Sequence, residues 1–287
     1  MINKLVIIGV GLIGSSLSLA LKQAGVVGQV VGCGRNQQSL QKGVELGVID
    51  HFEADITEAV QSADIIVVAV PLGAMESVFR QISRTLADNT IITDVGSSKG
   101  SVIDAARRAL GNRLPQFVPG HPIAGTEKSG LQAGFASLYQ NRRVILTPIA
   151  ETDPAAIQQV EAMWQHCGAQ TEYLGVEHHD KILAATSHLP HMLAYALVNY
   201  LSGLNHHDEI FKYAAGGFRD FTRIASSNPV MWRDVCLANG AALLPLIEGY
   251  KAELDRIANA IDRNDANTLL KLFDKAKFER DTLIGNC

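Results

Sequence analysis

The sequence predicts an α/β fold in two parts: a doubly wound, mainly parallel sheet at the N-terminus and an all-α part after it. Three observations predict this arrangement. Short β-rich runs alternate with helical patterns over the first half of the chain, a glycine-rich turn joins the first strand to the first helix, and beyond about residue 174 only helical periodicity remains. We therefore expect two domains, residues 1–174 and residues 175–287.

The strands of the first domain are expected where aliphatic and β-branched residues cluster. The candidates are Leu5–Gly9, Gln29–Cys33, Ile65–Val70, Thr90–Asp94, Phe117–Pro119 and Val144–Pro148. Helices are expected at Leu12–Ala24, Gln37–Leu46, Ala74–Leu86 and Gly100–Leu110, with one more that starts at Asp153-Pro154. The run from Ile65 to Val70 is wholly apolar, which is typical of a strand buried on both faces of a parallel sheet.

Helical periodicity defines the second domain. Apolar residues recur every three or four positions from Asp180 to Leu204 and again from Leu243 to Ile261, which predicts amphipathic helices. Proline lacks the N–H that a helix interior needs. Pro190 is therefore expected to kink the first helix, and Pro245 to kink or restart the second.

Composition excludes several classes of protein. The chain is 47% hydrophobic and 19% charged, with a formal net charge of −4, which is typical of a globular protein. It has no cluster of lysines or arginines, so we expect no nucleic-acid partner. No apolar stretch reaches the ~18 residues of a membrane span, so we expect no membrane association. The apolar start, Met1–Gly9, lacks a signal-peptide cleavage site and is interpreted as a strand.

The four cysteines, Cys33, Cys167, Cys236 and Cys287, are scattered and form no CxxC motif. This pattern argues against a metal site or a disulfide framework and favours a reducing, cytoplasmic location. The adjacent pairs His178-His179 and His206-His207 are interpreted as solvated, because neighbouring residues do not share a helix face.

A GVGLIG motif follows the first strand and opens the first helix; it consists of Gly9, Val10, Gly11, Leu12, Ile13 and Gly14. The first glycine permits a tight turn, the second lets the backbone approach a pyrophosphate, and the third lets helix and strand pack closely. The helix N-terminus offers free N–H groups to phosphates. The context predicts a Rossmann-type dinucleotide site; the alternative is a purely structural glycine turn.

The end of the second strand bears on which dinucleotide binds. An NAD site usually carries an acidic residue there, bonded to the ribose 2′-hydroxyl. Here Gly34 stands at that position and Arg35 follows. Loss of the carboxylate removes repulsion against a 2′-phosphate, and a guanidinium can bind that phosphate, so NADP is favoured, with NAD also possible. Alternatively, Arg35 stacks on adenine or points to solvent.

Two further strand ends lie on the edge where ligands bind in open α/β sheets. Val70, Pro71 and Leu72 are expected to border the nicotinamide. Asp94–Gly100, with sequence DVGSSKG, is a polar turn before a helix, and its simpler interpretation is an N-cap by one of its serines.

Four more segments resemble one enzyme family when taken in order. They are GHPIAGTEKSG at Gly120–Gly130, SHLPH at Ser187–His191, GGFRDFTRIA at Gly216–Ala225 and NPVMWRD at Asn228–Asp234. With the glycine motif and Gly96–Lys99, they resemble the prephenate and arogenate dehydrogenases along nearly the whole chain. The resemblance implies hydride transfer from C4 of prephenate to NAD(P)+, loss of the ring carboxylate as CO2, and 4-hydroxyphenylpyruvate as product. Arogenate, the amino analogue, would give tyrosine.

The resemblance also assigns residues. His121 would bond the 4-hydroxyl and accept its proton, a role that suits a neutral histidine. Ser97 would lie between this histidine, the substrate and the nicotinamide. Arg223 would bind a substrate carboxylate, with Arg219 one helical turn away. His191 would contact substrate, whereas a role for His188 stays open.

The loop after His121 supplies three more candidates by resemblance. Thr126 and Glu127 would lie beside the active site, where Glu127 could gate the pocket. An uncharged Gln132 favours prephenate, or the acceptance of both substrates, because arogenate carries an ammonium group that an acid would meet. Family members are dimers through the helical domain, so we expect a homodimer. The chain ends soon after Phe278, which would place any feedback by tyrosine at the active site itself.

Two other readings remain. A β-hydroxyacid or imine reductase shares the first domain and a helical second domain, and it would need Lys181 as a catalytic lysine. A non-catalytic NADP-binding sensor would keep the glycine motif but would need neither His121 nor the arginines.

Overall fold

The structure, a computed structural model, describes residues 1–284 and falls into two compact units, Met1–Gly240 and the segment from Ala241 onward. The first unit contains every strand of the described chain. Mixed α/β structure ends with β9 (Gln170–Tyr173), and helices follow. The domain boundary expected near residue 174 stays a prediction, since the first compact unit continues through the helices up to Gly240.

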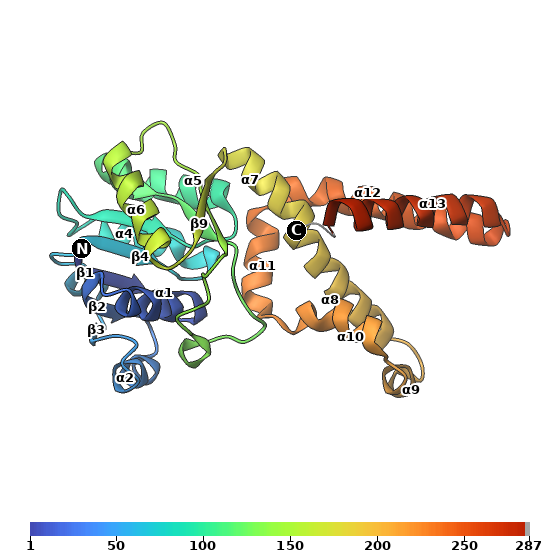
Figure 1. Cartoon of the computed structure of the whole chain (residues 1–287), viewed down its shortest axis with the longest axis horizontal. Helices are drawn as coiled ribbons and strands as arrows, with labels where there is room; N and C mark the ends of the chain where they lie inside the picture. Colours follow the sequence, from blue (N-terminus) through green and yellow to red (C-terminus); the bar gives the residue numbers. More distant parts are fainter. Residues whose placement is uncertain (285–287) are drawn as a thin grey trace. The chain divides into compact units, whose positions relative to one another are not determined.

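A parallel, six-stranded sheet forms the centre of the first unit (Figure 1). Its order is β3-β2-β1-β4-β5-β6, with β1 Ile2–Ile8, β2 Val27–Cys33, β3 His51–Glu53, β4 Ile65–Val68, β5 Ile91–Asp94 and β6 Phe117–Val118. The α/β class and the parallel sheet predicted from the sequence are confirmed. The chain reverses its direction of travel across the sheet between β1 and β4, and this switch point is where open α/β sheets bind ligands.

Two apolar layers cover the two faces of the sheet. Successive side chains of β1 point alternately into one layer and the other. Leu5 and Ile7 point to one face, where α1 (Leu12–Gln23) and α6 (Pro154–His166) pack. Val6 and Ile8 point to the other, where α4 (Met75–Ile82) and α5 (Lys99–Leu110) pack. Since both faces are covered, every side chain in the second half of β1 is buried and apolar.

The predicted elements of this unit are largely confirmed, with differences at their ends. The helix expected at Gln37–Leu46 is α2 (Gln37–Glu45), and Asp153 caps α6 as its sequence indicates. The short α3 (Ile56–Ala59) and the strand β3 were not predicted. Three residues is too short a run for alternation or propensity to identify a strand.

The strand expected at Val144–Pro148 does not join the main sheet. It is β8 (Arg143–Leu146), which pairs antiparallel with β7 (Gly120–Pro122) and parallel with β9 in a separate three-stranded sheet. Pro119 separates β6 from β7. Because it has no N–H, it interrupts strand pairing, and its carbonyl instead accepts a hydrogen bond from Thr147.

The helix expected from Asp180 to Leu204 is divided. It consists of α7 (Val176–Leu183), a π-helical turn at Ala184–His188, and α8 (Leu189–Ser202). Pro190 cannot donate to the carbonyl of Thr186, so the wider turn forms where the regular bonding pattern is broken. The irregularity that proline was expected to cause is therefore present just before it, and it carries His188.

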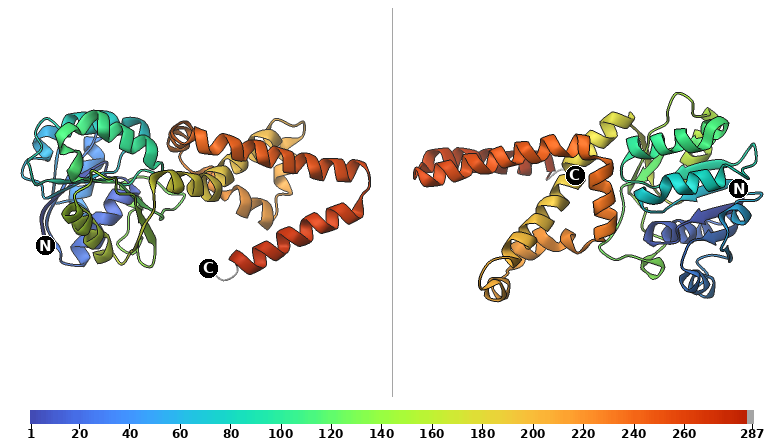
Figure 2. Two further views of the ribbon diagram at one scale, coloured as in Figure 1. Left: turned by 90° about the horizontal axis from the view of Figure 1, so that it is seen from above. Right: turned by 180° about the vertical axis from the view of Figure 1, so that it is seen from behind.

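Shorter helices complete the first unit: α9 (His207–Lys212), α10 (Gly216–Thr222), a 3-10 turn at Arg223–Ser226 and α11 (Pro229–Ala238). Asn228 caps α11, accepting bonds from Val230 and Met231. In the second unit, α12 (Gly240–Asp262) and α13 (Ala266–Glu279) run in opposite directions (Figure 2). The helix predicted at Leu243–Ile261 is confirmed, and it continues through Pro245 without a restart.

Both helices of the second unit expose large apolar side chains: Leu244, Tyr250, Leu254 and Ile261 from α12, and Leu270, Phe273 and Phe278 from α13. Among the residues that the structure describes, no single helix has the length and apolar composition to cross a membrane, although α11 with α12, as a bent pair, passes on length and composition alone.

A buried ion pair joins the segments that carry the candidate site. Lys99, at the start of α5, places its ammonium 2.5 Å from Oδ2 of Asp94 at the end of β5, and both side chains are completely buried. The same ammonium donates to the carbonyl of Gly120 at 2.6 Å, and Asp94 accepts from the N–H groups of Gly96 and Gly120. Three chain segments are thereby held at one point.

We predict that Lys99→Met lowers the free energy of unfolding by about 3–5 kcal/mol, because it leaves the Asp94 carboxylate buried without its counter-charge. Urea unfolding followed by circular dichroism measures the change. The control is Lys22→Met, which removes the half-exposed pair with Asp50 and is expected to cost less than about 1 kcal/mol. Equal losses in the two variants would contradict the assigned importance of the buried pair.

Candidate active site

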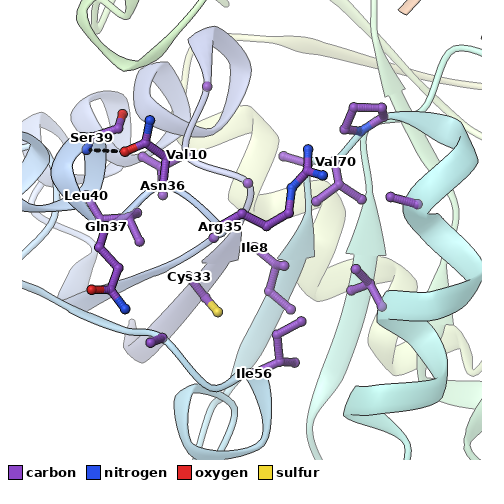
Figure 3. Close-up of a pocket in the computed structure, with 18 of the residues that line it drawn as sticks. Ile8, Val10, Cys33, Arg35, Asn36, Gln37, Ser39, Leu40, Ile56 and Val70 are labelled. Carbon is purple, nitrogen blue, oxygen red and sulfur yellow. Dashed lines mark hydrogen bonds between the residues drawn. The ribbon is translucent and has the colours of Figure 1, made fainter. Parts of the chain in front are cut away.

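The glycine-rich turn borders a pocket of about 1500 Å³ at the carboxyl edge of the sheet (Figure 3). Gly9 has φ +97°, and a Cβ there would lie 2.4 Å from the carbonyl oxygen of Ala69. A Cβ on Gly14 would lie 2.7 Å from the carbonyl oxygen of Gly9. A Cβ on Gly11 meets no protein atom within 4 Å, so this position faces open space that a pyrophosphate can enter.

Several predicted cofactor residues line this pocket and others support it. Gly9, Gly11, Gly34, Arg35, Val70 and Pro71 are on its wall. Leu12, Ile13 and Gly14 form the first turn of α1 beneath it, where the carbonyl of Ile13 accepts a 2.6 Å bond from the buried Tyr139 hydroxyl. Leu72 begins a 3-10 turn whose Gly73 N–H donates to Asp234 of α11.

The end of β2 presents an exposed arginine to the pocket. In Figure 3 the Arg35 side chain extends across the strand ends toward Val70, and Asn36 turns back to accept from Ser39 N–H. Within residues 1–284, no hydrogen bond or ion pair engages the Arg35 guanidinium. A Cβ on Gly34 would meet Leu40 Cδ1 at 4.0 Å, an ordinary van der Waals contact. The acidic residue on the pocket wall is Asp55, whose carboxylate caps α3 through Thr57.

A chain of three polar groups begins on β7 of the second sheet: His121 and His179 are buried, and Asp180 is partly buried. His121, on β7, is 8% exposed, and its Nδ1 lies 2.9 Å from Nε2 of His179 on α7. Nδ1 of His179 lies 2.8 Å from Oδ1 of Asp180. The pKa of His121 is held well below 6.5, chiefly by burial and further by the neighbouring His179, Lys99 and His188. His121 is therefore an uncharged imidazole at neutral pH.

The interpretation of His178-His179 as solvated is wrong for His179, which is completely buried, and right for His178, which is exposed. Neighbouring helix residues point in different directions, so one of a pair can be buried. The series expected from the sequence includes Ile182, which is 37% exposed, whereas the buried positions of this helix are His179 and Leu183, four residues apart. The polar identity of His179 obscured this spacing.

Asp180 also caps the helix that follows the polar turn. Its Oδ1 accepts from the N–H of Lys99 at 2.8 Å, and its Oδ2 accepts from the N–H of Gly100 at 2.9 Å. The N-cap expected from Ser97 or Ser98 is thus wrong in its acceptor: Ser98 occupies the N-cap position, but its side chain makes no cap bond. Burial raises the pKa of Asp180, yet the bonds from His179, Lys99 and Gly100 outweigh it and keep the pKa below its usual value.

His188, left open from the sequence, lies in the same region. Asn239 donates from Nδ2 both to the carbonyl of Asp180 at 2.9 Å and to Nδ1 of His188 at 3.1 Å. His188 Nε2 makes no regular hydrogen bond within the described chain, although the backbone of Ser97 lies close enough to affect its pKa. Burial lowers that pKa to about 4, so His188 is neutral with its proton on Nε2.

A second cluster lies on α8, α11 and the turn after α10. The His191 ring stacks on Trp232 with centroids 3.6 Å apart, and its Nδ1 donates to the carbonyl of Ser187 at 2.9 Å. Burial lowers the pKa of His191, and the nearby Arg223 lowers it further. Arg223 Nη1 lies 3.4 Å from Oε2 of Glu127, and both side chains are largely exposed. Trp232 links the clusters, since the His188 ring also contacts it, in a T-shaped arrangement with ring centroids 6.1 Å apart.

Three predicted residues are not brought into contact with these clusters. Arg219 is exposed on α10, and Thr126 bonds only within its own loop, to Lys128. Gln132 is exposed on a short turn, Leu131–Ala133, that packs on α1 and α2. Within residues 1–284, no hydrogen bond or ion pair joins any of the three to His121, His191 or Arg223.

Two chemical alternatives find no support in the described chain. Lys181, which a β-hydroxyacid or imine reductase would need, is exposed and pairs with Glu177 at 2.7 Å. No group of three or more histidine, cysteine or acidic side chains within residues 1–284 could hold a metal ion.

The glycine cradle at the switch point of a parallel sheet, with a neutral buried histidine beyond it, is that of a dinucleotide-dependent oxidoreductase. Comparison with known proteins agrees. The profile described as "Prephenate dehydrogenase, nucleotide-binding domain" matches residues 17–173, and "Prephenate dehydrogenase, dimerization domain" matches residues 175–275. The chain belongs to the prephenate dehydrogenase family.

Individual relatives cover nearly the whole chain. A cyclohexadienyl dehydrogenase of Zymomonas mobilis is 40% identical over 96% of this chain and 94% of its own. The crystal structure of prephenate dehydrogenase from A. aeolicus, in complex with hydroxyphenyl propionate and NAD+, is 35% identical with a TM-score of 0.90, over 98% of each chain. The structure of a Synechocystis arogenate dehydrogenase is 28% identical with a TM-score of 0.79, over 97% of this chain and 99% of its own.

We predict that Gly11→Ala folds with unchanged stability but binds dinucleotide at least ~10-fold more weakly, because the new methyl group occupies space that only a ligand needs. The matched variant Gly9→Ala is expected to lose about 2–3 kcal/mol of stability, since both its φ and the Ala69 carbonyl oppose a Cβ. Calorimetric titration and urea unfolding measure the two quantities. Undiminished binding by Gly11→Ala would contradict the assigned cradle.

Proposed function

We propose that this protein catalyses the oxidative decarboxylation of prephenate to 4-hydroxyphenylpyruvate, with hydride transfer to a nicotinamide dinucleotide. The observation that carries the proposal is His121: an uncharged, buried histidine that its neighbours hold by one ring nitrogen, in a chain of the prephenate dehydrogenase family. Such a group accepts a proton at neutral pH without first having to lose one.

The reaction needs one proton acceptor and no covalent intermediate. His121 takes the proton of the 4-hydroxyl at Nε2 while the carbinol C–H bond breaks and the C=O bond forms. The bound nicotinamide supplies the hydride acceptor. The ring carboxylate leaves as CO2, and its bonding electrons complete the aromatic ring and return the C=O electron pair to oxygen. That oxygen takes the proton back from His121, which gives the hydroxyl of the product. Ser97, on the turn that Lys99 and Asp180 hold, is assigned to the 4-hydroxyl beside His121.

Positive charge for the dianionic substrate comes from the second cluster. Arg223 can form two parallel hydrogen bonds to a carboxylate. Before substrate binds, its guanidinium pairs with the exposed carboxylate of Glu127. Exchanging that carboxylate for the substrate's costs little, because exposed ion pairs contribute about 0–1 kcal/mol. Glu127 is thus suited to gate the pocket. His191 presents Nε2 from its stack on Trp232, and Arg219 adds positive charge one helical turn before Arg223.

The cofactor is proposed to be NADP, with NAD also used. The domain is of the nucleotide-binding type, and the A. aeolicus relative was crystallised with NAD+. Support for NADP comes from the pocket wall, where an unengaged Arg35 follows Gly34 and no carboxylate stands at the usual ribose position. A 2′-phosphate would bind the guanidinium through charge-assisted bonds.

Three finer points belong to the proposal. Prephenate is favoured over arogenate because Gln132 is uncharged, although Gln132 makes no contact with the histidines in the described chain. The apolar side chains exposed on α12 and α13 support a homodimer through the matched dimerization domain. Cys33, Cys167 and Cys236 are free thiols, which supports a cytoplasmic location.

Initial rates with prephenate or arogenate, each with NAD or NADP, test the proposal through the absorbance of the reduced cofactor. We expect turnover of prephenate, fastest with NADP. Activity with arogenate alone would contradict the Gln132 argument. No turnover with any pair, by folded protein that binds cofactor, would contradict the function itself.

The same assay distinguishes the role of Arg223 in substrate binding from that of Arg35 in cofactor binding. Arg223→Gln is expected to raise KM for prephenate about 10–100-fold through the loss of a bond between charged groups, and Arg35→Ala to raise KM for NADP but not for NAD. The control is Arg256→Gln on α12, whose guanidinium pairs with Glu253 and which should leave both KM values unchanged.

The pH dependence should follow His121. Its pKa in the free enzyme lies well below 6.5, so the neutral, proton-accepting form is the main form at and above that pH. We expect kcat/KM to stay level from pH 8 to pH 6.5 and to fall only at lower pH, as the imidazole becomes protonated. Initial rates at low substrate measure it. A midpoint at or above pH 6.5 would contradict the assigned electrostatics.

A further inference from the structure

Hydrogen-bond accounting from Asp180 outward determines where the protons of the buried histidines lie. Asp180 accepts bonds from the backbone N–H groups of Lys99 and Gly100, and these donors favour the ionised carboxylate. A carboxylate can only accept. The 2.8 Å contact between Oδ1 and Nδ1 of His179 therefore requires a proton on that nitrogen.

The proton on His179 Nδ1 determines the next bond. A neutral imidazole carries one proton, so Nε2 of His179 is an acceptor. The 2.9 Å contact from this Nε2 to Nδ1 of His121 then requires a proton on His121 Nδ1. His121 is left with its lone pair on Nε2, the nitrogen that no residue of the described chain engages.

We propose that His179 and Asp180 are positioning residues that fix the tautomer of His121, with Nδ1 protonated and Nε2 free to accept the substrate's hydroxyl proton. The tautomer follows from the hydrogen-bond geometry with one proton on each imidazole, whereas the identity of the proton that Nε2 accepts rests on the proposed function. Without His179 as hydrogen-bond acceptor, neutral His121 would populate both tautomers, and the tautomer protonated at Nε2 cannot act as the base.

The surroundings also favour the cation that forms during reaction. Once His121 accepts a proton, its Nδ1–H bond to His179 becomes charge-assisted, and the Asp180 carboxylate lies at the far end of the same chain of hydrogen bonds. The other groups that affect the His121 ring offer no such compensation: Lys99 is cationic and already paired with Asp94, and His188 is neutral, held by Asn239. Asp180 is thus the carboxylate available to this site.

Two substitutions at His179 separate tautomer control from simple packing. His179→Gln can place Oε1 where Nε2 was, so it still accepts from His121. His179→Phe fills the space but accepts nothing. We expect kcat to fall about 10²–10³-fold in His179→Phe and about 10-fold or less in His179→Gln, within the range that general-base catalysis contributes. The matched control is His178→Phe, at the exposed neighbouring position, which should keep full activity.

Nitrogen-15 NMR of the imidazoles reads the tautomer directly in the wild-type protein and in both variants. We expect His121 to be protonated at Nδ1 in the wild type and in His179→Gln, and to be a mixture of tautomers in His179→Phe. Cofactor titration checks that each variant still binds dinucleotide. Rescue by glutamine with the Nδ1 tautomer restored would support the proposal, since packing alone does not distinguish the two variants in this way.

Other outcomes overturn it. Wild-type His121 protonated at Nε2, or His179→Phe within threefold of wild-type kcat, would refute the tautomer role. If His179→Phe does not fold, the wild-type spectrum and the glutamine variant decide the question. Failure of the proposed function looks different: the wild-type spectrum would show the Nδ1 tautomer, but no substrate pair would turn over.

Discussion

The buried ion pair of Lys99 and Asp94 is the interaction on which the rest of the site depends. It joins the end of β5, the start of α5 and the backbone just before His121, and both charged side chains are completely buried. Burying two charges is costly unless hydrogen bonds satisfy what remains. Here the carboxylate accepts from Gly96 and Gly120, and the ammonium donates to the Gly120 carbonyl, so the polar turn and the histidine strand are fixed together.

Asp180 makes a comparable connection between two helices, α7 and α5. The Asp180 carboxylate both caps α5 and orients His179. The start of α5 and the proton acceptor His121, which bonds to His179, are therefore positioned by the same side chain. This arrangement explains why the chain uses aspartate from a distant helix in place of a local serine cap. Ser98 could satisfy one N–H, but it could not orient a histidine at the same time. Burial lowers the pKa of both His121 and His188 and keeps both rings uncharged at neutral pH.

Local patterns predicted the sheet and its helices because they depend on local chemistry. Alternation, glycine turns and caps such as Asp153 are readable in a few residues. The three-stranded sheet could not be predicted, because β7 contains only three residues and its pairing depends on a partner more than twenty positions away. Of the site, the motif histidine and arginine were found through family resemblance. His179, Asp180 and Asn239 were missed, since their roles exist only once α7, α5 and α11 meet.

The two ends of the proposed site differ in solvent exposure, and their chemistry follows from this. Arg223 and Glu127 are exposed and loosely paired, so the carboxylate partner of the arginine can be exchanged with little change in free energy. His121 is enclosed, so its orientation and protonation state must already be correct before substrate arrives, because reorganising dipoles in a buried site would add to the barrier. An exposed pair therefore suits the binding of a dianion, whereas the buried hydrogen-bond chain suits the transfer of a single proton.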